Sequence, residues 1–143
     1  MLKNIPPILS PELLKILCEM GHGDRIVIGD GNFPAASNAK RLIRADGHGV
    51  PELLDSILTV IPLDKYVDCP AQLMALTPDD AVKLGDPPIW KEYAEIIERH
   101  EPETKMGQIE RFAFYEEARK AYAVIATGES AIYANIILQK GVI

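Results

Sequence analysis

The stretch EMGHGDRIVIGDGNFPA, residues 19–35, decides the fold, because it sets one short apolar run between two groups of glycine and polar residues. The run Ile26–Ile28 is bounded by turn residues, a pattern typical of a buried strand. GHGD (21–24) precedes the run and DGN (30–32) follows it. A purely structural loop rarely needs His, Asp and Gly together, so both ends of this strand are candidates for a ligand site.

Composition indicates one globular domain. The chain has 143 residues, of which 48% are apolar and 25% charged, and this is enough to bury a hydrophobic core. Its net charge of -6 disfavours binding to nucleic acid or to an anionic membrane surface, which both require a basic face. No internal repeat, low-complexity tract or linker divides the chain, so we expect a single domain over residues 1–143.

The sequence also favours a cytoplasmic protein. No apolar run approaches the roughly 18 residues that a membrane span needs. Pro6 and Pro7 interrupt the first residues, so these cannot form the apolar part of a signal peptide. The two cysteines, Cys18 and Cys69, form no CxxC pair and are expected to be reduced thiols.

Local signals predict alternating helices and strands. Ser10 is a favoured N-cap and Pro11 suits the first helical position, so a helix is expected over 11–20. Similar patterns predict helices over 51–58, for one or two turns from 78, over 89–97 and over 112–121. Strands are expected at 26–28, 41–45, 71–76, 122–127 and 133–138, and the polar residues 100–107 are predicted to be a surface connection.

This alternation predicts an α/β fold, with a mixed sheet flanked by helices in a single three-layer domain. The last two predicted strands lie close together around residues 128–130. We expect them to pair as a hairpin, and an antiparallel hairpin would make the sheet mixed.

His22 is the first candidate catalytic residue. It follows the predicted end of a helix, where the helix dipole favours a protonated imidazole, and Asp24 beside it acts in the same direction. Gly21 and Gly23 leave the ring accessible to a ligand, so His22 suits a general acid. The alternative is a histidine that only binds the last carbonyl groups of the helix.

Asp30 and Asn32 follow the strand at 26–28, where ligand sites are often built. The Asp30 carboxylate can accept hydrogen bonds from ligand hydroxyls or act as a base, whereas Asn32 can hydrogen-bond but cannot titrate. The alternative for Asp30 is an Asx turn that stabilises the loop.

The segment Tyr133-Ala134-Asn135 and Arg111 are further candidates for ligand binding. Asn is depleted in strands, so its position at the start of an apolar strand suggests a specific hydrogen bond. Arg111 precedes an aromatic-rich helix and could reach a ligand oxygen. The alternatives are a strand-entry turn for Tyr133 and an ion pair with Glu110 for Arg111.

No metal or cofactor is expected. The chain has no HxH, HExxH or EF-hand pattern, no complete dinucleotide fingerprint and no GxSxG nucleophile motif. His48 and His100 do not share a metal-ligand spacing with His22.

These features together resemble the ribose pyranase and fucose mutarotase (RbsD/FucU) family, and within it the fucose branch. The motifs run in order along nearly the whole chain: SPELL (10–14), GHGD (21–24), Asp30 with NFPA (32–35), RADG (44–47), RFAFY (111–115), TGE (127–129) and YAN (133–135). The ordered set is far more specific than any one motif.

The resemblance implies an isomerase that interconverts the α and β anomers of L-fucose without metal or nucleotide. It implies His22 as proton donor, with sugar-binding residues at Asp30, Arg111, Tyr133, Ala134 and Asn135. It also implies a ring-shaped homo-decamer. Asn32 stands where some fucose-type relatives have His, and residues 77–103 match the family pattern least.

Three other functions stay open at this point. The chain could be a D-ribose pyranase or a mutarotase of broader scope, and an apolar wall for the C6 methyl group of a 6-deoxy sugar would separate these from a fucose enzyme. It could also be a monosaccharide-binding protein without catalysis, or a scaffold without ligand.

The expected chemistry needs an acid for the ring oxygen and a base for the anomeric hydroxyl. His22 is the expected acid, and Tyr133 or Asp30 the partner that moves the other proton. A full strand would separate His22 from Asp30 by about 20 Å, too far for one monosaccharide. Either the strand is short and bent, or His22 of one subunit meets Asp30 of another, and we favour the shared site.

Overall fold

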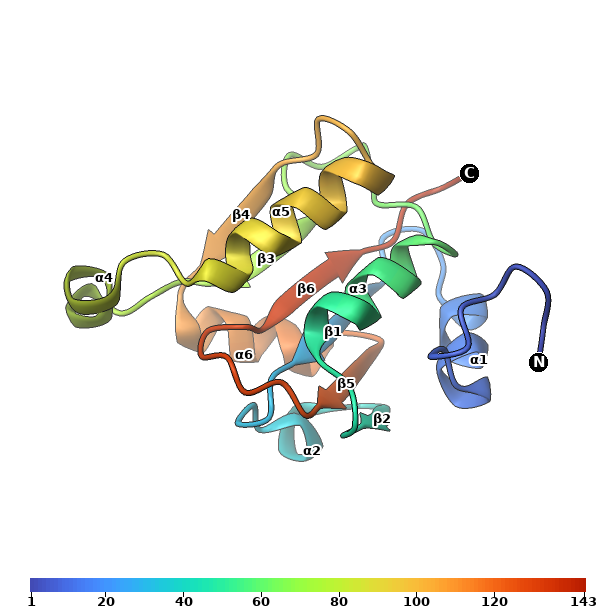
Figure 1. Ribbon diagram of the computed structural model, residues 1–143, viewed down its shortest axis with the longest axis horizontal. Helices are drawn as coiled ribbons and strands as arrows, with labels where there is room; N and C mark the ends of the chain where they lie inside the picture. The colour runs from blue at the N-terminus through green and yellow to red at the C-terminus, as the bar shows by residue number, and fades with distance from the viewer.

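The computed structural model describes residues 1–143 (Figure 1). The helices are α1 (Pro11–Glu19), α2 (Ala35–Asn38), α3 (Val50–Leu58), α4 (Pro78–Leu84), α5 (Pro88–His100) and α6 (Arg111–Lys120). The strands are β1 (Arg25–Gly29), β2 (Leu42–Ala45), β3 (Ala71–Met74), β4 (Met106–Ile109), β5 (Ala123–Thr127) and β6 (Ile136–Gln139). No helix is both long and apolar enough to cross a membrane.

The six strands form one sheet in the order β2-β5-β1-β6-β3-β4. β1 pairs with β5 in parallel and with β6 antiparallel, and β6 is also antiparallel to β3. The predicted mixed sheet is therefore confirmed. The predicted hairpin is wrong, because β1 lies between β5 and β6 and pairs with both of them.

Side chains of β1 alternate between two cores, and this makes the domain three-layered. Ile26 and Ile28 pack in the larger core against α1, α3 and α5, whereas Val27 packs in the smaller core with α2 and α6. This alternation follows from the two-residue period of a strand. In Figure 1, α3 and α5 cross one face of the sheet and α6 lies behind the other.

Helix starts follow the sequence signals. The Ser10 hydroxyl accepts a hydrogen bond from the Leu13 amide at 3.1 Å, and the Thr77 hydroxyl accepts one from the Asp80 amide at 3.2 Å. Both side chains satisfy amides that have no partner inside the helix. The second case fixes the start of α4, which buries none of its own residues and projects from the body of the domain (Figure 1).

Two elements differ from the sequence prediction. Met106–Ile109 forms the edge strand β4, parallel to β3, although residues 100–107 were predicted to be a surface connection. None of its four residues is fully buried, so the strand lacks the apolar run that identifies an inner strand. The four-residue α2 was not predicted, because it is too short to show helical periodicity.

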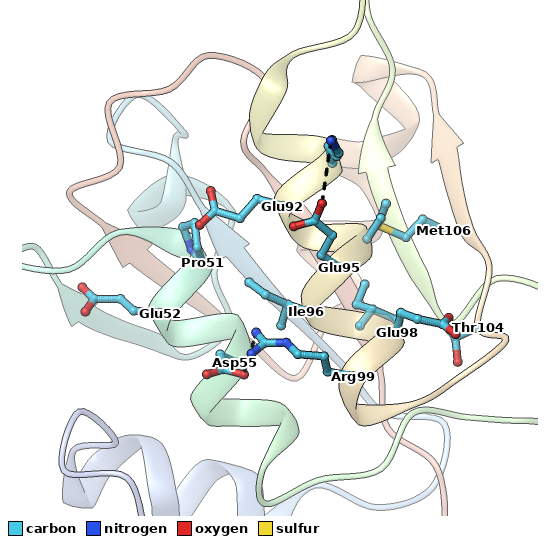
Figure 2. Close-up of a pocket in the computed structure, with 13 residues that line it drawn as sticks. Pro51, Glu52, Asp55, Glu92, Glu95, Ile96, Glu98, Arg99, Thr104 and Met106 are labelled. Carbon is cyan, nitrogen blue, oxygen red and sulfur yellow. Dashed lines mark hydrogen bonds and ion pairs between the residues drawn. The ribbon is translucent and has the colours of Figure 1, made fainter.

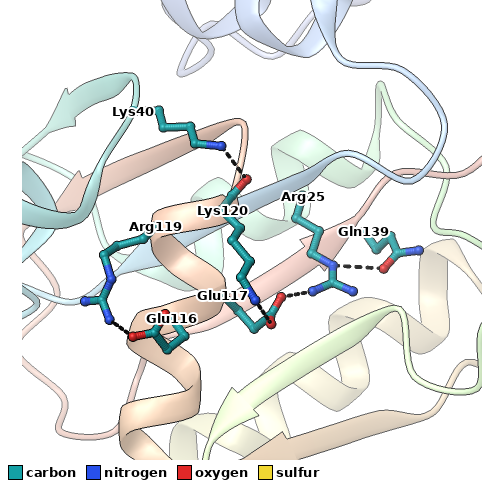
Figure 3. Close-up of polar contacts among 7 residues, drawn as sticks. All are labelled: Arg25, Lys40, Glu116, Glu117, Arg119, Lys120 and Gln139. Atoms are coloured by element: carbon teal, nitrogen blue, oxygen red, sulfur yellow. Dashed lines mark hydrogen bonds and ion pairs between the residues drawn. The ribbon is translucent and has the colours of Figure 1, made fainter.

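Polar contacts hold α6 against the sheet (Figure 3). Arg25 in β1 donates from Nε to Gln139 Oε1 at 3.0 Å and forms an ion pair with Glu117 in α6. The Lys40 ammonium donates to the Lys120 carbonyl at 3.3 Å, near the end of α6. These contacts fix the axis of α6, and its opposite end carries Arg111.

Gly128→Ala is expected to destabilise the domain. A Cβ atom at Gly128 would lie 2.0 Å from the Asp46 carbonyl oxygen, so backbone would have to move. We expect a loss of about 1–3 kcal/mol in the free energy of unfolding, measured by urea denaturation. Gly47→Ala is the matched control, because a Cβ atom there meets no atom within 4 Å. Equal urea midpoints for the two variants would contradict the assignment of this close contact.

Candidate functional site

A cavity of about 250 Å³ opens where β1 and β3 end and β6 begins. The edge of a sheet beyond the carboxyl ends of its strands is a common place for ligand sites in α/β proteins. Nine residues line the cavity: Asp30, Asn32, Phe33, Met74, Arg111, Tyr115, Ile132, Tyr133 and Asn135. Four of the predicted sugar-binding residues therefore meet around one space.

Asp30 is held at the base of this cavity by Asn135. The Asn135 side-chain oxygen accepts from the Asp30 amide at 2.8 Å, and both residues are buried. Asp30 Oδ1 accepts from the Asn32 amide at 3.0 Å, so the Asx turn is present and the same residue also lines the cavity. Burial raises the pKa of the Asp30 carboxyl, although backbone amides, that of Asn32 foremost, act in the opposite direction.

Residues Tyr133 and Ala134 are fixed by two aromatic side chains of α5. Trp90 Nε1 donates to the Tyr133 carbonyl at 2.8 Å, and the Tyr93 hydroxyl donates to the Ala134 carbonyl at 2.7 Å. Tyr133 has a φ of 55°, in the left-handed region that non-glycine residues rarely adopt. The fully buried Ala134 does not line the cavity, so its part in the site is to carry this fixed backbone.

Arg111 stands at the first position of α6 and points its guanidinium over aromatic rings. Its Nε donates to the Tyr115 hydroxyl at 3.1 Å, and its guanidinium carbon is 5.6 Å from the Tyr115 ring centroid. Glu110 does not pair with Arg111, because its carboxylate accepts from the Phe112 and Ala113 amides as the cap of α6. The Arg111 charge is therefore free to face a ligand in the cavity.

Part of the cavity lining is apolar. Phe33, Met74 and Ile132 contribute to its lining, opposite in character to the carboxyl, amide and guanidinium groups described above. Ile132 is 52% exposed, so part of this apolar lining lies at the surface. The cavity thus offers hydrogen-bonding groups and an apolar wall to the same ligand.

His22 lies outside this cavity, before the opposite end of β1. Its Nε2 is 3.2 Å from Asp64 Oδ1, and its ring centroid is 5.6 Å from that of Tyr66. Within one chain, His22 and Asp30 are therefore separated by the length of the strand. The alternative role as a helix cap is wrong, because Lys140 Nζ takes the last α1 carbonyls, those of Leu17 and Met20.

Asp64 is a candidate site residue that sequence reasoning missed. Its side chain is only 3% exposed, and its pKa is lowered first by the Tyr66 amide and further by Gln139 and His22. The buried Asp64 carboxylate fixes the orientation of the His22 imidazole. Asp24 was expected to act on this imidazole, but it accepts instead from the Gly21 amide at 2.8 Å. Asp64 lies in no motif, so no signal along the chain marks it.

The other large depression and the other two histidines lie away from the cavity and from the His22–Asp64 pair. A broad depression of about 1230 Å³ lies between α3 and α5, and five of its 13 lining residues are acidic (Figure 2). His48 and His100 pair with Glu52 and Asp55 on this side of the fold. No three His, Cys, Asp or Glu side chains lie close enough together to hold a metal ion.

The poorly matching stretch 77–103 lines no part of the cavity, but it supports residues that do. Trp90 and Tyr93 hold the backbone of residues 133 and 134, as described above. The Tyr133 hydroxyl donates to the Asp80 carboxylate in α4. The contacts of this stretch with the site therefore run through the backbone of residues 133 and 134 and the Tyr133 hydroxyl.

Comparison with known proteins identifies the family. Residues 3–143 match the model of the RbsD / FucU transport protein family. The chain is 51% identical to the fucose mutarotase of Homo sapiens, over 99% of this chain and 94% of that protein.

Solved structures agree with this match. The crystal structure of FucU from Bifidobacterium longum has a TM-score of 0.93 to this chain at 59% identity, with 99% of each chain covered. The fucose mutarotase of Streptococcus pneumoniae, solved in complex with L-fucose, has a TM-score of 0.91 at 52% identity, again with 99% of each chain covered.

Asp30→Asn is expected to stabilise the folded protein at neutral pH. Because burial raises the pKa of Asp30 above its unfolded value, the ionised carboxylate weakens folding at neutral pH, and this loss disappears as the pH falls below the unfolded pKa. An amide oxygen can still accept from Asn32. We expect a higher urea midpoint than wild type at pH 7 and a smaller difference at pH 4.

The control for this variant is Asp68→Asn at an exposed carboxylate, which should leave the urea midpoint nearly unchanged at both pH values. A gap between Asp30→Asn and wild type that widens as the pH falls would contradict the raised pKa.

Proposed function

The chain belongs to the RbsD / FucU family, and from this membership and the cavity beside Asp30 we infer that it interconverts the α and β anomers of L-fucose. It is thus an isomerase of the racemase and epimerase class. The observation that carries this conclusion is the meeting of Asp30, Arg111, Tyr133 and Asn135 around one cavity, in a chain about half identical to fucose mutarotases.

The apolar wall of the cavity favours L-fucose over D-ribose. L-fucose carries a methyl group at C6, and Phe33, Met74 and Ile132 provide an apolar surface for such a group. A pentose offers no methyl group to this surface. We propose that Asp30, Arg111 and Asn135 bind the sugar hydroxyls on the other side, with Asn32 as a further hydrogen-bonding group.

Mutarotation requires two proton transfers, at the ring oxygen and at the anomeric hydroxyl. We propose that His22, held by the ionised Asp64, protonates the ring oxygen. Tyr133 or Asp30 takes the anomeric proton, the ring opens to the aldehyde, C1 turns, and the reverse transfers close the ring on the other face. The reaction regenerates every group that it uses.

His22 and the cavity act together only if they come from different subunits. Both groups flank the same strand at opposite ends, so one chain cannot bring them to one sugar. We propose that His22 of one subunit completes the cavity of its neighbour in a ring-shaped homo-decamer, located in the cytoplasm. A head-to-tail contact of this kind forms a ring when the rotation between neighbouring subunits closes.

The first test is the rate of anomer exchange in equilibrated L-fucose, measured by saturation-transfer NMR. The wild type should accelerate exchange, and His22→Ala should lower the enzymatic rate by about 10²- to 10⁴-fold through loss of the acid. His48→Ala is a matched control, because that histidine lies away from both sites and should keep the wild-type rate. A wild type that binds L-fucose but leaves exchange at its rate in water would be a binding protein and not an enzyme.

The second test asks whether the site is shared. His22→Ala and Asp30→Asn should each be inactive alone, yet their co-expressed mixed oligomers should recover about one quarter of the wild-type rate, because random assembly pairs two intact halves at that frequency. Sedimentation should give the mass of ten chains. Mixed oligomers that stay inactive would show that His22 and Asp30 serve one site from the same chain.

A further inference from the structure

Asp80 in α4 contacts the cavity only through Tyr133. The Tyr133 hydroxyl donates to Asp80 Oδ2, and the Thr77 amide lies 3.5 Å from the same phenol oxygen. Asp80 is neither a cavity-lining residue nor part of any ion pair. The hydrogen bond from the Tyr133 hydroxyl is therefore the one that links Asp80 to the lining of the cavity.

The position of Asp80 is itself fixed. The Thr77 hydroxyl accepts from the Asp80 amide at 3.2 Å, which sets the first turn of α4. The Trp90 indole holds the Tyr133 backbone from the other side at 2.8 Å. The Tyr133 hydroxyl and the Asp80 carboxylate are thus held toward one another by contacts with α5 and α4. This holds although α4 buries none of its own residues.

A neutral phenol cannot serve as a base by itself. An unperturbed tyrosine has a pKa near 10 and keeps its proton at neutral pH. It can accept a proton from a sugar hydroxyl only if its own proton leaves at the same time. The pKa of Asp80 is lowered by the hydrogen bond from Tyr133 and further by Thr77, so its carboxylate is ionised at neutral pH and has a free site for the proton that Tyr133 gives up.

We infer that Asp80 is the positioning residue through which Tyr133 acts as the base of the mutarotase reaction. This inference rests on the proposed function and assigns the proton transfer that the function leaves between Tyr133 and Asp30. In this assignment Asp30 binds the sugar, with Oδ1 held by the Asn32 amide.

The proton transfers balance. The anomeric O–H bond breaks and a new O–H bond forms at Tyr133 Oη, while the original Tyr133 proton moves to Asp80 Oδ2. The C1–ring oxygen bond breaks, C1 becomes a carbonyl carbon, and the ring oxygen takes a proton from His22. Ring closure reverses each transfer, so Asp80 returns to the carboxylate and His22 to the imidazolium.

Asp80→Asn tests this inference, because the amide keeps the size of the side chain and an acceptor for Tyr133 but cannot take up a proton. We expect the maximal exchange rate of L-fucose anomers to fall by about 10²-fold, with little change in the half-saturating sugar concentration. Asp80→Glu retains a carboxylate and should exchange faster than Asp80→Asn. The matched control is Asp79→Asn, the exposed neighbour in the same helix, which should keep the wild-type rate.

A double variant separates this role from a merely structural one. Asp80→Asn should lower the rate no further in a Tyr133→Phe background, because the phenol that links it to the sugar is gone. Losses of exchange rate that add up in the double variant would overturn the inference while the proposed function stands. A wild-type exchange rate in Asp80→Asn would do the same. If the wild type itself leaves fucose exchange at its rate in water, the proposed function is wrong and the inference fails with it.

Discussion

The amide of Asp30 must find a hydrogen-bond acceptor in the protein interior, and Asn135 supplies it at 2.8 Å. A buried amide without a partner costs about 1–3 kcal/mol, so the end of β1 and the start of β6 have to meet. The antiparallel register of these strands makes this possible. The cavity is a result of the same contact, because Asp30 and Asn135 line it and Tyr133 lies just before Asn135 in the chain.

Most of the fold could be predicted from local patterns. The run at 26–28, the cap at Ser10 and the helix that follows Gly49 all appear close to where the sequence places them. Pairing between distant strands could not be predicted in this way. β5 and β6 are neighbours in sequence, but β1, buried from Ile26 to Gly29, lies between them in the sheet, so proximity along the chain predicted the wrong partner.

The residues of the candidate site also fall into those that the sequence could predict and those that it could not. Four candidates stand out in the sequence because polar residues at strand ends have few structural reasons to be there. The fold gathers these four around one cavity: Asp30, Arg111, Tyr133 and Asn135. The partners of His22 and Tyr133 are carboxylates in unremarkable stretches. Asp64 and Asp80 are recognised only from three-dimensional contacts, because a single acidic residue near a loop carries no distinctive pattern.

The chain contains one tryptophan, and its indole N–H is bound to the carbonyl of a cavity-lining residue. Trp90 is almost fully buried, so the surroundings of its ring depend on the backbone of Tyr133 and not on solvent. The fluorescence of the Trp90 indole is therefore expected to depend on the conformation of the cavity-lining residue Tyr133. Ligand entry into the cavity can then be followed at that one ring, without a label.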